Sequence, residues 1–126
     1  MALDPGLIAS FEHVVTDHDT AIAFGSGDVP VLATPRIVAL TERATVLCVS
    51  AELTSDLTTV GVKVAIDHLL PTGVGRAVRV DALLEAVEGR RLTFAVRVSD
   101  AERTVAEGIV VRVLVTRERF LRVVGA

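Results

Sequence analysis

The sequence has little of what several classes of protein require. Cys48 is the only cysteine, so no disulfide can form within the chain and zinc sites built from paired cysteines are excluded. Lys and Arg number 13 against 16 Asp and Glu and form no run, so the basic patch of a nucleic-acid-binding protein is missing and we expect no nucleic-acid partner. Cys48 lies in the apolar run VLCV, which indicates a small buried side chain rather than a nucleophile.

Long apolar runs are missing as well. No stretch reaches the roughly 18 to 20 uncharged residues that cross a bilayer, and the start, MALDPGLIAS, lacks the basic and apolar regions of a signal peptide. We therefore expect a cytoplasmic protein with no membrane partner. The 126 residues, 51% of them hydrophobic, are enough to enclose one core, so we expect a single domain over residues 1–126.

What the sequence does contain is a set of runs rich in strand-forming residues. They cover residues 7–16, 58–69, 76–88, 91–100 and 103–115. The last four are separated by PTGVG, EGR and DAER, short turn-like segments that favour antiparallel neighbours. Within residues 76–88, Val78 and Val80 fall on one side of the strand and Arg79 and Asp81 on the other, so one face of the sheet is expected to meet water.

One long helix is predicted between the first strand and the others. Thr34 suits the N-cap and Pro35 the first helical position of ATPRIVALTERATVLCVSAEL. From Ile37 to Val49 this helix is apolar or small nearly all the way round, which predicts that protein surrounds it. The simplest way to hide it beside a one-sided sheet is to curl the sheet around it, which is the α+β hotdog fold.

A single unit of this kind leaves apolar surface uncovered. It has a free sheet edge, and its strand IVVRVLV is apolar on both sides. We therefore expect a homodimer, and the sequence leaves a tetramer open.

His68 is the first candidate for chemistry. In VGVKVAIDH it shares its side of the strand with apolar residues, namely Val60, Val62, Val64 and Ile66, and should face the helix. One interpretation is a core histidine bonded to backbone groups, and the other is a catalytic group with a partner.

Glu42 and Thr34 are candidates on the helix. The neighbours of Glu42 at three and four residues carry no positive charge, so its carboxylate must reach solvent, find a remote partner or take up a proton. It marks either a solvated helix edge or an active site. Thr34 lies about 12 Å before Glu42 along the axis, at a helix start whose N–H groups and dipole suit an ordinary cap or an oxyanion.

Other signals are weak. His13 and His18 lack the spacing of a metal site, and PTGVGR is typical of a turn. GxSxG, GxGxxG, Walker-type and HExxH motifs do not occur. We expect no metal and no cofactor.

Several segments resemble the fluoroacetyl-CoA thioesterase-like family of hotdog proteins. They are ATPRIVALTERA, VGVKVAIDHLLPTGVG, VRVDALLEAVEGRRLTFAVRVSD, VAEG and RERFL, and the likeness covers most of the chain from about residue 29. The resemblance implies that Thr34, Glu42 and His68 form a catalytic set at a dimer interface and that Gly61 and Arg112 line the acyl-CoA site. The expected activity is hydrolysis of a small or medium acyl-CoA thioester.

The chain also departs from that family. Val110 and Val111 stand where the family often has His and Glu, so a non-catalytic acyl-CoA-binding module is the main alternative. An enoyl-CoA hydratase using Asp67 and His68 is a weaker one, because these neighbours point to opposite sides of a strand. GSGDVP has no aromatic residue where the fluoroacetate-specific member carries a lid, so we expect a different acyl group.

Overall fold

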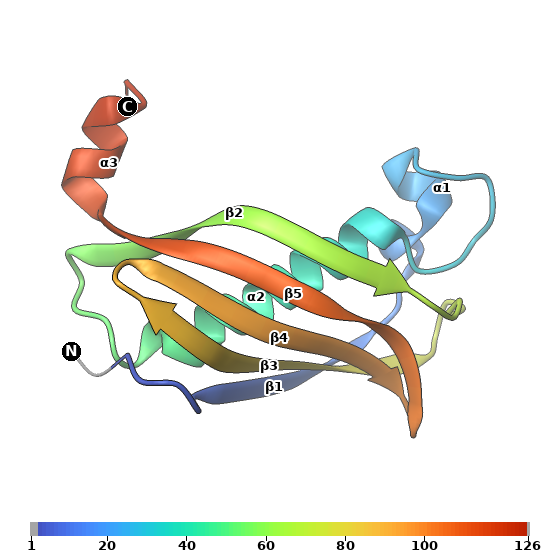
Figure 1. Ribbon diagram of the computed structural model, residues 1–126. Helices are drawn as coiled ribbons and strands as arrows, with labels where there is room; N and C mark the ends of the chain where they lie inside the picture. Colours follow the sequence, from blue (N-terminus) through green and yellow to red (C-terminus); the bar gives the residue numbers. More distant parts are fainter. Residues whose placement is uncertain (1–2, 126) are drawn as a thin grey trace.

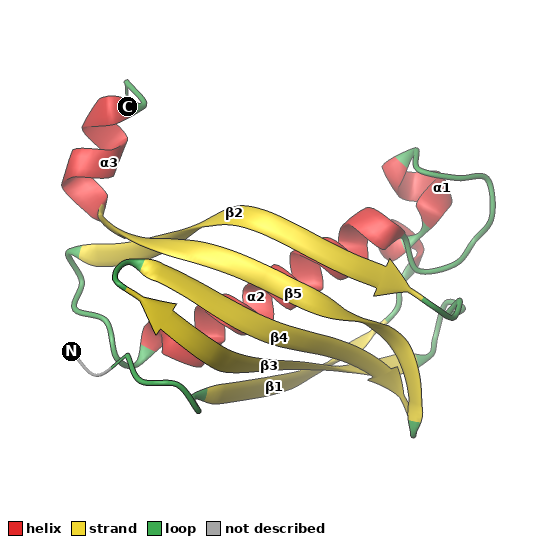
Figure 2. Cartoon of the chain, viewed as in Figure 1, coloured by secondary structure: helices red, strands yellow, loops and turns green. Residues whose placement is uncertain are grey.

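The computed structural model describes residues 3–125 and contains one curved antiparallel sheet with a long helix across one face (Figures 1 and 2). In chain order the elements are β1 (Ile8–Val14), η1 (Asp17–Asp19), α1 (Ala21–Phe24), α2 (Thr34–Ser50), β2 (Leu57–His68), β3 (Ala77–Glu88), β4 (Arg91–Asp100), β5 (Arg103–Thr116) and α3 (Arg117–Val123). The predicted hotdog architecture is confirmed.

The sheet order is β1-β3-β4-β5-β2, so β1 and β2 form its two edges. The five predicted strands are all present. The prediction that PTGVG joins neighbouring strands is wrong, since β2 pairs with β5 and not with β3. Residues of that segment instead hold the loop before α2: Leu32 N donates to Thr72 O at 2.8 Å, and Val31 bridges to Gly73.

Helix α2 differs from the prediction in two ways. Ala33 is the N-cap and Thr34 already belongs to the helix, because the Thr34 hydroxyl bonds to another element instead of capping the first turn. Protein also covers only one side of α2. Its buried face consists of Ile37, Leu40, Thr41, Ala44, Thr45, Cys48 and Val49. On the opposite side Val46 and Leu47 are each 43% exposed, so a single sheet does not enclose the helix.

Strand β2 contains a bulge that changes which side chains face α2. Gly61 is opposite Arg112 and Lys63 is opposite Val111, so Val62 is an extra residue on β2. As a result Thr59 and Gly61 face the helix before the bulge, and Ile66 and His68 face it afterwards. The prediction for His68 is confirmed, whereas the prediction that Val60 and Val62 share its face is wrong.

The core lies between α2 and the inner face of the sheet. Its largest fully buried side chains include Phe94, Leu84 and Val80 from the sheet and Ile37 and Leu40 from α2. Cys48 joins this core as predicted, 7% exposed, with Sγ 3.1 Å from Leu7 O. Burial raises the pKa of the Cys48 thiol, which keeps it protonated and unreactive. No helix within residues 3–125 is long and apolar enough to cross a membrane.

Candidate functional site

The first part of the site joins the start of α2 to the end of β2. Thr34 Oγ1 lies 2.8 Å from His68 Nδ1. On the other side of the ring, His68 Nε2 lies 3.1 Å from the backbone oxygen of Leu70. A carbonyl can only accept, so Nε2 carries a hydrogen, and in the neutral ring Nδ1 accepts the proton of the Thr34 hydroxyl. The ring thus has a side-chain partner, the Thr34 hydroxyl, as well as a backbone partner, the Leu70 carbonyl.

His68 is also reachable from outside. A hollow of about 200 Å³ is lined by Val31, His68, Leu69, Leu70 and Pro71. The Thr34 side chain is exposed at the same end of the sheet. A reacting group can therefore approach the hydrogen-bonded pair.

The second part of the site lies two turns further along α2. Glu42 Oε2 is 3.4 Å from Arg112 Nη1, and these side chains are 36% and 9% exposed. Arg112 reaches from β5 toward β2, where its Nε donates to Thr59 Oγ1 at 2.8 Å and its Nη2 to Thr59 O at 3.0 Å. Burial lowers the pKa of the Arg112 guanidinium while Glu42 raises it, and the group stays charged at neutral pH. Glu42 is thus a carboxylate with a remote cationic partner.

Gly61 leaves room for the Glu42 carboxylate beside this ion pair. A Cβ at position 61 would overlap Glu42 Oε2 and lie 3.4 Å from Arg112 Nη1. The bulge and the missing side chain together let β2 approach the carboxylate. Gly61 and Arg112, expected on resemblance to line the acyl-CoA site, both adjoin Glu42.

The five candidate residues therefore form two groups on one face of the chain. Thr34 contacts His68, and Glu42 contacts Arg112 next to Gly61, but within the described chain no hydrogen bond connects the two groups. That one cleft unites Glu42 with His68 stays a prediction. Thr59 was not predicted from the sequence. It lies two residues before Gly61 and therefore on the same side of β2, but the extra residue at Val62 reverses the sides of the strand, so the alternation counted from His68 puts Thr59 on the wrong side.

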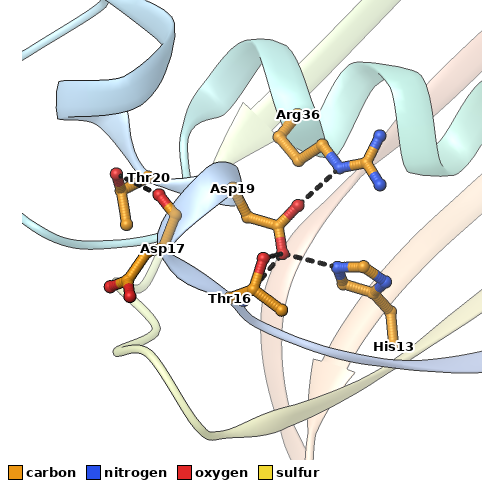
Figure 3. Close-up of polar contacts among 6 residues, drawn as sticks. All are labelled: His13, Thr16, Asp17, Asp19, Thr20 and Arg36. Carbon is orange, nitrogen blue, oxygen red and sulfur yellow. Dashed lines mark hydrogen bonds and ion pairs between the residues drawn. The ribbon is translucent and has the colours of Figure 1, made fainter.

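The start of α2 is held by Asp19, whose side chain lies at the centre of a polar network (Figure 3). Its carboxylate accepts from His13 Nε2 at 2.8 Å, Arg36 Nε at 2.8 Å, and the backbone N and hydroxyl of Thr16 at 2.8 and 3.1 Å. Asp19 O also accepts from Ala33 N at 2.9 Å. Burial by itself would raise the pKa of Asp19, but the hydrogen bonds from Thr16 and His13 outweigh it and lower the pKa to about 2. Asp19 thus binds residues on both sides of Thr34.

Other parts of the structure offer less for catalysis. Among residues 3–125 no three His, Cys, Asp or Glu side chains are grouped to hold a metal ion. A hollow of about 580 Å³ lies on the sheet face turned away from α2, and none of the five candidates lines it. Its lining includes Ile8, Leu83, Ala95 and Ile109.

Comparisons with known proteins identify the family and the fold. The family model of the fluoroacetyl-CoA-specific thioesterase FlK matches residues 15–118. The structure of FlK matches with a TM-score of 0.91 and 28% identity, over 98% of this chain and 96% of FlK. An FlK variant in complex with fluoroacetate and CoA matches with a TM-score of 0.86 and 28% identity, over 94% and 99% of the two chains.

Two other solved structures extend the comparison. A thioesterase-superfamily protein from Thermus thermophilus has a TM-score of 0.89 and 26% identity, over 97% of this chain and 90% of its own. A hot-dog-like protein from Thermanaerovibrio acidaminovorans has a TM-score of 0.87 and 22% identity, over 95% and 89%, and shows the shared fold. No curated protein matches the chain significantly. Since the family model covers most of its length, this chain belongs to the fluoroacetyl-CoA-specific thioesterase family of hotdog proteins, which are thioester hydrolases.

Proposed function

We propose that this protein hydrolyses the thioester of a small or medium acyl-CoA, with Thr34, Glu42 and His68 as catalytic residues and Gly61 and Arg112 as substrate-binding residues. The observation that carries the proposal is the 2.8 Å contact between Thr34 Oγ1 and His68 Nδ1 on the same helix face as the Glu42 and Arg112 pair. A hydroxyl, an imidazole and a carboxylate are the groups that acyl transfer needs.

The chemistry follows from these groups. Water oxygen bonds to the carbonyl carbon, the carbon–sulfur bond breaks, and the CoA sulfur leaves with the electron pair and takes a proton. Glu42 either attacks the carbonyl itself, with water later opening the acyl-enzyme, or accepts the proton of the attacking water. His68 carries protons between water and the leaving sulfur, and Thr34 holds the imidazole and presents its hydroxyl to the carbonyl oxygen.

A homodimer is part of the proposal. Strand β2 carries Gly61 and His68 and lies at a free edge of the sheet, with Val62 52% and Leu69 53% exposed. A second copy added along this edge would cover these apolar side chains and pair the open backbone groups. It would also bring a second set of site residues close to the first.

The test is thiol release from a panel of acyl-CoAs with short, branched, aromatic and long acyl groups. Glu42→Gln and His68→Ala should each lower kcat by about a hundredfold or more, since a positioned acid or base contributes that much, while circular dichroism and Tm change little. Near-normal rates in both variants would contradict the residue assignment. Tight acyl-CoA binding without thiol release by the unmodified protein would favour the non-catalytic binding module.

A further inference from the structure

A second hollow lies between the last turns of α2 and the start of β2. It measures about 250 Å³, and we call it the α2–β2 cleft. Its lining residues are Val46, Val49, Ser50, Leu53, Thr54, Ser55, Leu57, Thr58, Thr59 and Arg117. The residues assigned to catalysis are not among them, so the cleft has no role in the mechanism above.

The cleft nevertheless adjoins the Glu42 part of the site through Thr59. Thr59 lines it and accepts the hydrogen bond of Arg112 Nε at 2.8 Å, and Arg112 in turn contacts Glu42. Val46 lines it from α2, four residues after Glu42 and therefore on the same side of the helix one turn away. The cleft and the ion pair of Glu42 with Arg112 therefore share Thr59 as a neighbour.

Part of the cleft wall suits an alkyl chain, and a similar part is polar. Val46, Val49, Leu53 and Leu57 provide apolar walls, whereas hydroxyl groups line the remainder. Arg117 is its one cationic residue, and this guanidinium is directed at the carbonyl oxygens of Ser55 and Leu57 at 3.3 and 3.5 Å. The anionic diphosphate of CoA would need a cationic side chain with free donors, and Arg117 already donates to two backbone oxygens.

The volume of the cleft also favours the acyl group over CoA as its ligand. Sites for whole small molecules usually measure about 300 to 1,000 Å³, so this cleft holds a part of a ligand. At about 30 Å³ for a water-sized group it accommodates on the order of six to eight methylene groups. Acetyl or fluoroacetyl would leave most of it empty.

We propose that the α2–β2 cleft binds the acyl chain of the substrate and selects medium, unbranched chains such as hexanoyl and octanoyl. This assignment rests on the proposed thioesterase function and specifies its substrate class. Val46 and Leu53 are then specificity-determining residues, because both are apolar side chains that line the cleft.

The experiment measures kcat/KM of the full-length protein for straight-chain acyl-CoAs from acetyl to dodecanoyl. The unmodified protein should prefer hexanoyl or octanoyl over acetyl. Val46→Phe fills the cleft and should lower kcat/KM for octanoyl-CoA at least about tenfold relative to acetyl-CoA, the scale set by losing a few methylene contacts. Leu53→Ala should move the optimum toward longer chains. Leu47→Phe is the matched control, because Leu47 has the same 43% exposure as Val46 and does not line the cleft.

The outcomes separate the two proposals. An unchanged chain-length profile in Val46→Phe, or an equal change in Leu47→Phe, would overturn the acyl site and leave the thioesterase assignment standing. Absence of thiol release from any acyl-CoA by the unmodified protein would overturn both. A profile that shortens with Val46→Phe and lengthens with Leu53→Ala supports the acyl site.

Discussion

At the residue scale, Gly61 illustrates how a missing side chain can serve a site. An added Cβ there would meet the carboxylate end of Glu42, which is flexible and can move aside, rather than backbone. Gly61→Ala should therefore displace Glu42 with little change in stability, within about 1 kcal/mol. Because a small misplacement of a reacting group is costly, we expect kcat/KM to fall roughly a hundredfold, measured by thiol release alongside thermal unfolding.

Gly108 gives the contrasting case for this measurement. A Cβ at Gly108 would overlap the backbone of Ala65 and Ile66 in the paired strand, where no side chain can give way. Gly108→Ala should thus lower the free energy of unfolding by about 2 kcal/mol or more. If Gly61→Ala were the destabilised variant and kept its activity, the role assigned to Gly61 would be wrong.

The same residues show how much of the candidate site the sequence predicts. Thr34, Glu42 and His68 stand out as chemically suited side chains, and resemblance added Gly61 and Arg112. Neither chemical type nor resemblance predicted two further side chains that hold the site residues in place. Thr59 was hidden by the one-residue bulge at Val62, which no alternation pattern reveals, and Asp19 lies 15 residues before Thr34 in a segment without motifs.

At the scale of elements, Asp19 connects η1 to α2 and sets the position of Thr34. It binds Arg36 through its carboxylate and Ala33 through its backbone oxygen, so we expect it to act as a positioning residue for the contact between Thr34 and His68. Asp19→Asn should lower kcat about tenfold, the equivalent of one hydrogen bond lost to a charged group. In a Thr34→Ala background the same change should lower kcat no further, because the group it positions is gone.

Asp100 is the matched control for this cycle. It is 6% exposed against 4% for Asp19, and it pairs with Arg76 in a separate part of the sheet, with Oδ2 2.9 Å from Arg76 Nη2. Asp100→Asn should reduce stability and leave kcat unchanged. Additive effects of Asp19→Asn and Thr34→Ala on kcat would show that Asp19 is merely structural.

The low pKa of Asp19 also predicts how this junction responds to acid. Its pKa falls from 3.8 to about 2 on folding, so the unfolded chain binds the proton more readily. The carboxylate therefore stabilises the fold above about pH 4, by roughly 2 kcal/mol, and this stabilisation disappears as the pH falls toward 2. Denaturant unfolding at a series of pH values should show the stability of unmodified protein and Asp19→Asn converging in that range. A constant difference down to pH 2 would contradict it.

Strands and helices differ in how well the sequence predicted their surroundings. The alternation of Val78 and Val80 with Arg79 and Asp81 predicted the buried face correctly. In a sheet with one face in water, successive side chains of a strand point alternately to the core and to solvent, so the strand's own sequence indicates which face is buried. The apolar character of α2 on all sides was misread as burial within one chain. In the structure the second apolar side, with Val46 and Leu47, lies open.

At the scale of the whole molecule, the free edge of β2 argues for a second copy of the chain. The other sheet edge, β1, offers a fair comparison, since Val14 on β1 is 55% exposed and Val62 on β2 is 52% exposed. Of these two edge strands, only β2 carries proposed site residues. Val62→Glu should therefore separate a homodimer into monomers and abolish thiol release, because a charge at a pairing edge opposes association, whereas Val14→Glu should stay dimeric and active. Light scattering with size-exclusion chromatography gives the mass of each variant, and a Val62→Glu protein that remained dimeric, or stayed fully active as a monomer, would show that the β2 edge does not complete the site.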